Sequence, residues 1–297
     1  MSVHLANVGK ETAPRTITWS RQECALYALA VGADFSDLPY VLDEGNEDFR
    51  VLPTFPLALL SAHAARSEDS MLGAGDFEGH VQVLAGQALE LYSPLPTSGS
   101  ISVTGRLEAI YDKTNAASVV LASTARRSDT GELLFTAQTT MFILGAGGFG
   151  GARGPQQARI EMPQRAPDMQ QVLVTSPIQS LLYRHASGDT HGIHADPRVA
   201  TAAGFAGPIL GGQNTLGIAA HAIVRAAADG HGDRVRAISG RFTAPALNSD
   251  MLTTEMWRLP PEPGSQNELI HFRVVNQRNE VVIQAGECRL GPANEAR

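Results

Sequence analysis

The sequence predicts an α+β fold in which two similar halves each wrap an antiparallel sheet around a helix. Two observations carry this prediction: one helix-like segment followed by four strand-like segments occurs twice along the chain, and the second helix-like segment is apolar around most of its circumference. A helix that is apolar nearly all round is a buried helix, and the strands that follow it can form the layer that covers it. The 297 residues are enough for two such units.

The first half is predicted from apolar periodicity and turn residues. A helix is expected over Phe55–Arg66, and Asp129-Thr130-Gly131 marks the turn between the last two strands. The four strands are expected at His80–Tyr92, Ser100–Tyr111, Ser118–Arg127 and Leu133–Leu144.

The second half repeats this order. The buried helix is expected over Asn214–Ala228, about 22 Å long at 1.5 Å per residue. Its four strands are expected at Val235–Thr243, Met251–Leu259, Glu268–Val275 and Val281–Leu290. The stretch Leu91–Pro96 also precedes a strand in the way that Arg241–Pro245 does, so we interpret the chain as a divergent duplication.

A segment rich in glycine and proline separates the halves. It begins with the run from Gly145 to Pro155 and includes Pro163 and Pro167, a composition typical of irregular, extended backbone. The predicted organisation is therefore a first half over residues 1–145, a linker over 146–170 and a second half over 171–297.

Composition and charge narrow the classes of function. The formal net charge is −7 and no Lys/Arg run occurs, so neither nucleic acid nor a membrane surface is expected as a partner. Cys24 and Cys288 fit no disulfide or zinc pattern and are expected to be small buried apolar residues. With no apolar leader at residues 1–18, we expect a cytoplasmic protein.

The segment Ser187–Pro197 is the strongest candidate for chemistry. It places Asp189 and His194 five residues apart on a turn-rich stretch, a carboxylate and an imidazole that can exchange protons near neutral pH. Asp189 after Ser-Gly can also be explained as a turn-forming or capping aspartate. Asp196 followed by Pro197 is expected to cap a helix and to take no part in chemistry.

The motifs around this segment resemble those of the MaoC-like, (R)-specific enoyl-CoA hydratases, also called hydratase 2. The Gly-rich run with Arg153 and the stretch Val51–Phe55 resemble the long, two-half members. The residues that carry the resemblance in the second half are Tyr183, Arg184, Ser187, Gly188, Asp189, His194, Asp196, Pro197, the loop Gly204–Leu210, Gly212, Thr215 and Gly217.

This resemblance implies a double hot-dog fold, a pseudodimer in one chain, with a non-catalytic first half that accommodates the acyl group. It implies a hydro-lyase that reversibly hydrates trans-2-enoyl-CoA to (R)-3-hydroxyacyl-CoA, with a long or bulky acyl chain and no cofactor. Asp189 and His194 match the acid/base pair, and Gly212 matches the donor to the thioester oxygen. The residues expected to contact the substrate are Tyr183, Arg184, His191, Gly211 and Arg153.

The sequence departs from the family pattern at several positions. His191 and Gly192 stand where Asn-Pro is usual, Gly211 stands where a histidine is usual, and Ala85 replaces a histidine of the first half. Two alternatives therefore stay open: a dehydratase of a specialised or carrier-bound thioester, and a non-catalytic relative that binds acyl thioesters. A monomer or a homodimer of such pseudodimers is expected.

Further titratable residues have simpler interpretations. The spacing of His185, Asp189, His191, His194 and His221 fits no metal template, so no metal is expected. His221, on the predicted buried helix, is expected to be a satisfied core histidine. Candidates for the phosphates of CoA are Arg153, Arg184 and Arg241.

Overall fold

The computed structural model describes residues 2–64, 71–155, 160–261 and 264–293. Its first half contains two short strands, the outer strand β2, three helices and four long strands. These elements are β1 (Ser2–Val3), β2 (Arg15–Trp19), α1 (Arg21–Ala30), α2 (Leu38–Val41), α3 (Phe55–Ala64), β3 (Gly75–Asp76), β4 (Gln82–Leu91), β5 (Gly99–Asp112), β6 (Ala116–Arg127) and β7 (Leu133–Leu144).

The second half repeats the order of strand, helices and four strands. Its elements are β8 (Met169–Val174), α4 (Gln179–Ser187), α5 (Pro197–Ala202), α6 (Gly212–Ala226), β9 (Val235–Phe242), β10 (Met251–Leu259), β11 (Glu268–Asn276) and β12 (Val281–Leu290).

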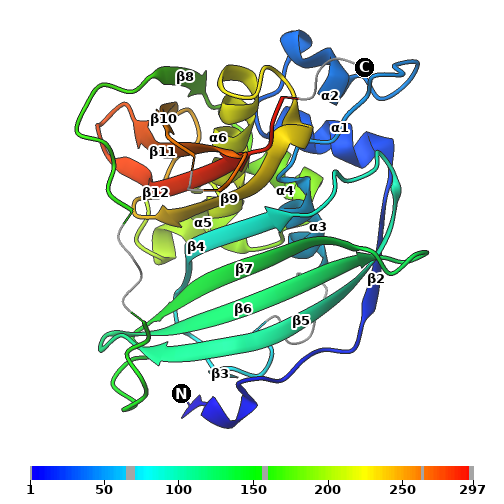
Figure 1. Ribbon diagram of the computed structural model, residues 1–297. Helices are drawn as coiled ribbons and strands as arrows, with labels where there is room; N and C mark the ends of the chain where they lie inside the picture. Colours follow the sequence, from blue (N-terminus) through cyan, green and yellow to red (C-terminus); the bar gives the residue numbers. More distant parts are fainter. Residues whose placement is uncertain (1, 65–70, 156–159, 262–263, 294–297) are drawn as a thin grey trace.

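The long strands form one antiparallel sheet of ten strands in the order β2-β5-β6-β7-β4-β9-β12-β11-β10-β8. Each half supplies five neighbouring strands, and the two sets join where β4 pairs with β9, with Leu89 opposite Ile238. Figure 1 shows this curved sheet continuing from one half into the other, with α6 lying against the strands of the second half. The α+β, double hot-dog prediction is confirmed, with the refinement that the two sheets merge edge to edge.

All eight predicted strands and both predicted helices are present, with ends that differ by at most two residues within the described chain. The predicted end of the first helix, at 65–66, lies outside the described residues. The sequence analysis missed β1, β2, α1, α2, β3, β8 and α4. A signal for α1 was available, since Ser20 and Glu23 form a capping box, in which each side chain accepts from the other residue's backbone N–H.

The segment after β7 is irregular, as predicted, and is fastened to the first half. The carboxylate of Asp112 accepts hydrogen bonds from the backbone N–H groups of Gly148 and Gly150, at 2.9 and 2.8 Å. A Cβ at Gly147 would lie 2.3 Å from the carbonyl oxygen of Thr114, so only glycine fits there. Strand β8 begins at Met169, inside the range 146–170, and the predicted domain boundaries stay a prediction.

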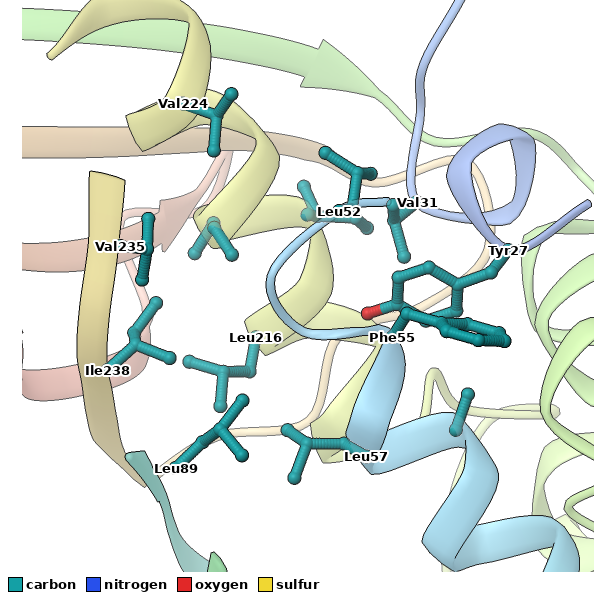
Figure 2. Packing of buried hydrophobic residues seen from close by; sticks show 14 of the residues in the cluster. Tyr27, Val31, Leu52, Phe55, Leu57, Leu89, Leu216, Val224, Val235 and Ile238 are labelled. Carbon is teal, nitrogen blue, oxygen red and sulfur yellow. The ribbon is translucent and has the colours of Figure 1, made fainter. Parts of the chain in front are cut away.

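Helix α6 forms the centre of the core, and its Leu216 is fully buried. Figure 2 shows Leu216 close to Leu89 of β4 and Ile238 of β9, at the junction of the two halves. The helix therefore packs against residues from both halves and links their folding.

Both cysteines are buried and free, as expected for small apolar residues, and burial raises the pKa of the Cys24 thiol to about 12. His221 of α6 is also buried, as expected for a core histidine. Its Nε2 lies 3.2 Å from Asp37 Oδ1 without the geometry of a hydrogen bond, so the expectation that the side chain is satisfied is not confirmed. No helix in the described part of the chain is long and apolar enough to cross a membrane.

Replacing Leu216 by alanine should lower the free energy of unfolding by about 2–5 kcal/mol, because it removes a fully buried side chain and leaves a cavity at the junction. Urea unfolding followed by circular dichroism measures this loss. Leu29→Ala, which shortens a half-exposed side chain on α1, is the matched control and should change stability by less than about 1 kcal/mol. Equal losses in the two variants would contradict the packing described here.

Candidate functional site

The predicted catalytic segment follows directly from the end of α4. Gly188 ends this helix with φ +65°, in the left-handed region, and a Cβ there would lie 3.0 Å from the Cβ of Ala62. The hydroxyl of Ser187 donates to the carbonyl of Tyr183 and accepts a hydrogen bond from the backbone N–H of Asp189. These contacts fix where the chain leaves the helix and where Asp189 begins the next turn.

Asp189 uses its two carboxylate oxygens differently. Oδ1 accepts a hydrogen bond from the backbone N–H of His191 at 2.9 Å, which is the turn-forming role. Oδ2 lies 3.9 Å from Nε2 of His194. The turn-forming interpretation is therefore confirmed. The carboxylate also faces the imidazole, and its acid/base role stays a prediction.

His194 is held in one orientation by the backbone. Its Nδ1 lies 2.9 Å from the carbonyl oxygen of Ile209, which can only accept, so Nδ1 carries the proton. In the neutral imidazole, Nε2 then has a free lone pair on the side that faces Asp189. Burial lowers the pKa of His194 below its ordinary 6.5, although the charge of Asp189 opposes this shift. Neutral His194 is thus a proton acceptor near neutral pH.

The first turn of α6 forms the third side of this centre. A Cβ at Gly211, the residue before the helix, would lie 3.7 Å from His194 Nε2. The backbone N–H groups at a helix start have no partner within the helix and favour negative charge. A Cβ at Gly212 would lie 2.9 Å from Leu84 Cδ2 and 3.2 Å from the Phe242 ring, so the helix start is closely packed from both halves.

Asp189, His194, Gly211 and Gly212 line one cleft of about 2160 Å³. The cleft extends from this centre over the first half, where residues of α3, β4, β5, β6 and β7 line it. Its lining also includes Tyr183 and His191. The fold therefore brings the predicted acid/base pair, a helix start and the first half to the same space.

The other predicted contact residues of the second half support the loop. Arg184 Nη1 donates to the backbone carbonyl of Asp189 at 3.1 Å. His191 Nδ1 accepts from the backbone N–H of Ile193, and its ring centroid lies 5.8 Å from that of His194. Tyr183 is buried, its ring packs edge-on against Tyr27, and burial raises the pKa of its phenol well above the ordinary value.

Of the three arginines predicted to contact the phosphates of CoA, the fold places only one among the residues that line the cleft. Arg241 lines the cleft. Arg153 instead donates to the hydroxyl of Thr114 in the turn between β5 and β6, and it is not among the residues that line the cleft. Its backbone carbonyl also accepts a hydrogen bond from Lys113 Nζ at 2.6 Å, so both contacts hold it to the same turn. Its predicted role in substrate binding stays a prediction.

The outcome for the remaining loop residues is clear. Asp196 accepts from the backbone N–H of Arg198 and Pro197 opens α5, which confirms the capping interpretation. At Gly192, a Cβ would lie 3.2 Å from both methyl groups of Val199, so close packing explains a glycine there.

Sequence reasoning missed three contributions to the centre. The carbonyl of Ile209 orients His194, Leu84 packs on Gly212, and Gln87 and Gln213 form hydrogen bonds beside the helix start. No spacing in the sequence predicts these contacts, because each joins segments that only the tertiary fold brings together.

Comparison with known proteins gives consistent results over most of the chain. Residues 18–145 match the MFE-2 hydratase 2 N-terminal domain, and residues 158–279 match the MaoC like domain. The chain is 34% identical over 265 residues to 3-hydroxyacyl-thioester dehydratase Y of Mycobacterium tuberculosis, covering 88% of this chain and 89% of that protein. It is 35% identical over 291 residues to enoyl-CoA hydratase ChsH3 of the same organism, covering 96% and 97%.

A solved structure shows the same fold. The MaoC-like dehydratase from Phytophthora capsici superimposes with a TM-score of 0.81 at 24% identity, covering 99% of this chain and all of that one. The matched domains, the full-length relatives and the placement of Asp189 and His194 beside the start of α6 lead to one conclusion. The chain belongs to the MaoC-like hydratase 2 family.

Proposed function

We propose that this protein adds water to the double bond of trans-2-enoyl-CoA to give (R)-3-hydroxyacyl-CoA, and catalyses the reverse dehydration, through Asp189 and His194. The assignment to the hydro-lyases follows from the family, whose members include enoyl-CoA hydratases and a 3-hydroxyacyl-thioester dehydratase. The observation that carries the proposal is the free lone pair on His194 Nε2, 3.9 Å from Asp189 Oδ2 and next to the helix start at Gly211.

The proposed reaction needs one water held between the two side chains. His194 Nε2 accepts one proton from this water as the water oxygen bonds to C3 of the substrate. Asp189 Oδ2 holds the other hydrogen and stabilises the imidazolium that forms. The imidazolium then returns its proton to C2, so the atoms of one water are added and His194 is neutral again.

The thioester oxygen gains negative charge while C3 is attacked. We place it at the N–H of Gly212, because the free N–H groups at a helix start are aimed at anions. One donor of this kind contributes on the order of 3 kcal/mol to the stabilisation of an oxyanion. The helix start would therefore matter about as much as either side chain.

The size of the cleft supports a long or bulky acyl group. Pockets for small molecules typically measure roughly 300–1,000 Å³, and this cleft, at about 2160 Å³, is larger. Gly105 of β5, Ser123 of β6 and Thr139 of β7 are among the residues that line it over the first half. We place the acyl chain across these strands and the CoA moiety towards the second half, with Arg241 as a candidate for its phosphates.

No cofactor and no metal enter the proposed reaction, since proton transfer and charge stabilisation are both supplied by the chain. The cytoplasmic location and the choice between a monomer and a homodimer stay predictions.

Asp189→Asn and His194→Ala should each lower kcat for hydration of trans-2-enoyl-CoA by at least about 100-fold, because each removes a group that handles the water's protons. Loss of enoyl absorbance gives the rate, and chiral chromatography identifies the product. Asp196→Asn on the same loop and the exposed His185→Ala are matched controls and should keep wild-type rates. Wild-type turnover in Asp189→Asn or His194→Ala would contradict the assignment, and binding of enoyl-CoA by a folded wild type without turnover would favour a non-catalytic role.

The pH profile of kcat/KM for hydration should fall on the acid side only below pH 6.5. The reason is that His194 must be neutral to accept a proton, and burial holds its pKa below the ordinary 6.5. Rates measured from pH 4.5 to 8 on folded protein test this expectation. An acid limb centred above pH 7 would show that a different group is the base.

Gly105→Phe should lower kcat/KM for long-chain enoyl-CoA by at least about tenfold while leaving a four-carbon substrate within about twofold. A Cβ at this position would lie 3.4 Å from Leu72 Cδ1 and 3.6 Å from Thr12 Cγ2. Gly105, Leu72 and Thr12 all line the cleft, so a larger side chain here takes up space in it. The short substrate serves as the internal control for folding and chemistry. If wild type turns over only short substrates, or if Gly105→Phe reduces both rates equally, the acyl group does not lie here.

A further inference from the structure

A chain of four polar side chains crosses the cleft beside the start of α6. Thr139 Oγ1 and Gln213 Nε2 both donate to Gln87 Oε1, each at 3.1 Å. The hydroxyl of Ser61, on α3, donates to Gln213 Oε1. All four residues line the cleft, and they come from α3, β4, β7 and α6.

The orientation of Gln87 is fixed by the sheet. Its Nε2 donates to the backbone carbonyl of Gln138 at 3.1 Å and to that of Ala88 at 3.3 Å, and only 3% of the residue is exposed. Its Oε1 must therefore face α6 as a hydrogen-bond acceptor. A buried amide fixed on both sides is a rigid anchor, because turning it would leave several buried groups unpaired.

Gln87 contacts the first turn of α6, which bears the proposed oxyanion donor. Gln213 is the second residue of α6 and directly follows Gly212. Leu84, on the same strand as Gln87, packs against Gly212. A Cβ at Gly212 would lie only 2.9 Å from Leu84 Cδ2. The start of α6 is thus held by one polar contact and one apolar contact from β4 of the first half.

We infer that Gln87 and Gln213 are positioning residues, which hold the N–H of Gly212 where the thioester oxygen gains charge, so that the half without the acid/base pair still contributes to catalysis. This inference rests on the proposed function. A displacement of about 1 Å at a reacting centre can cost on the order of 100-fold in rate. The expected loss therefore falls on kcat, since neither side chain is needed to bind CoA.

The experiment compares Gln87→Leu, Gln213→Leu and the double variant in the full chain, with trans-2-enoyl-CoA as substrate. Each single variant should lower kcat by about tenfold or more and change KM by less than about twofold. The double variant should be no slower than the worse single variant, because both substitutions break the same contact. Gln87→Glu keeps the acceptor for Gln213 and Thr139 but sets a second acceptor against the carbonyl oxygens of Gln138 and Ala88, so it should lose rate as Gln87→Leu does. The control is Gln170→Leu on the exposed face of β8, which should behave as wild type.

A second readout separates this inference from the proposed function. Hydrogen exchange of the Thr215 amide, which donates to the carbonyl of Gly211 across the first turn of α6, should speed up at least about tenfold in Gln87→Leu and remain unchanged in Gln170→Leu. If the wild type hydrates no enoyl-CoA, the proposed function fails, and exchange still reports whether the anchor exists. Unchanged exchange overturns the inference, as does an active wild type whose Gln87→Leu and Gln213→Leu variants keep kcat or lose it additively.

Discussion

The pairing of β4 with β9 is the interaction on which the site depends. It joins two five-stranded sets into one sheet, with Leu89 opposite Ile238 and Leu216 of α6 packed over the junction. Because the strands are held in this register, Leu84 of the first half reaches the first residue of α6 in the second. The second half supplies the predicted acid/base pair, and the first half supplies side chains that pack beside it.

The surroundings of Asp189 and His194 set the exposure of both side chains and the tautomer and pKa of His194. A carboxylate and an imidazole are common on protein surfaces, but here their side chains are only 28% and 19% exposed. The carbonyl of Ile209 fixes the tautomer of His194, and burial keeps its imidazole neutral near pH 7. Asp189 opposes this shift, which suits the proposed mechanism, in which His194 first accepts a proton and then returns it.

Sequence reasoning found what is encoded by local patterns. The repeated strands and α6 have clear periodicity, and Asp189 and His194 lie close together in sequence as well as in space. Strands β2 and β8 were missed because they are short edge strands, and α1 was missed although Ser20 and Glu23 mark its start. Arg153 was assigned to the substrate from its place in a motif. This assignment stays a prediction, and the guanidinium contacts Thr114. Gln87 and Gln213 are 126 positions apart, so no local signal joins them.

The most direct measurement is the stereochemistry of hydration in D₂O. Asp189 and His194 approach the substrate from one side of the cleft and share one water, so both new bonds should form on the same face of the double bond. The product should then be the (3R)-hydroxyacyl thioester alone, with deuterium at C2 on the face that receives the hydroxyl, as read by chiral analysis and NMR. Deuterium on the face opposite the hydroxyl, or spread over both faces during a single addition, would contradict a single centre formed by Asp189 and His194. A (3S) product would contradict the proposed (R)-specificity.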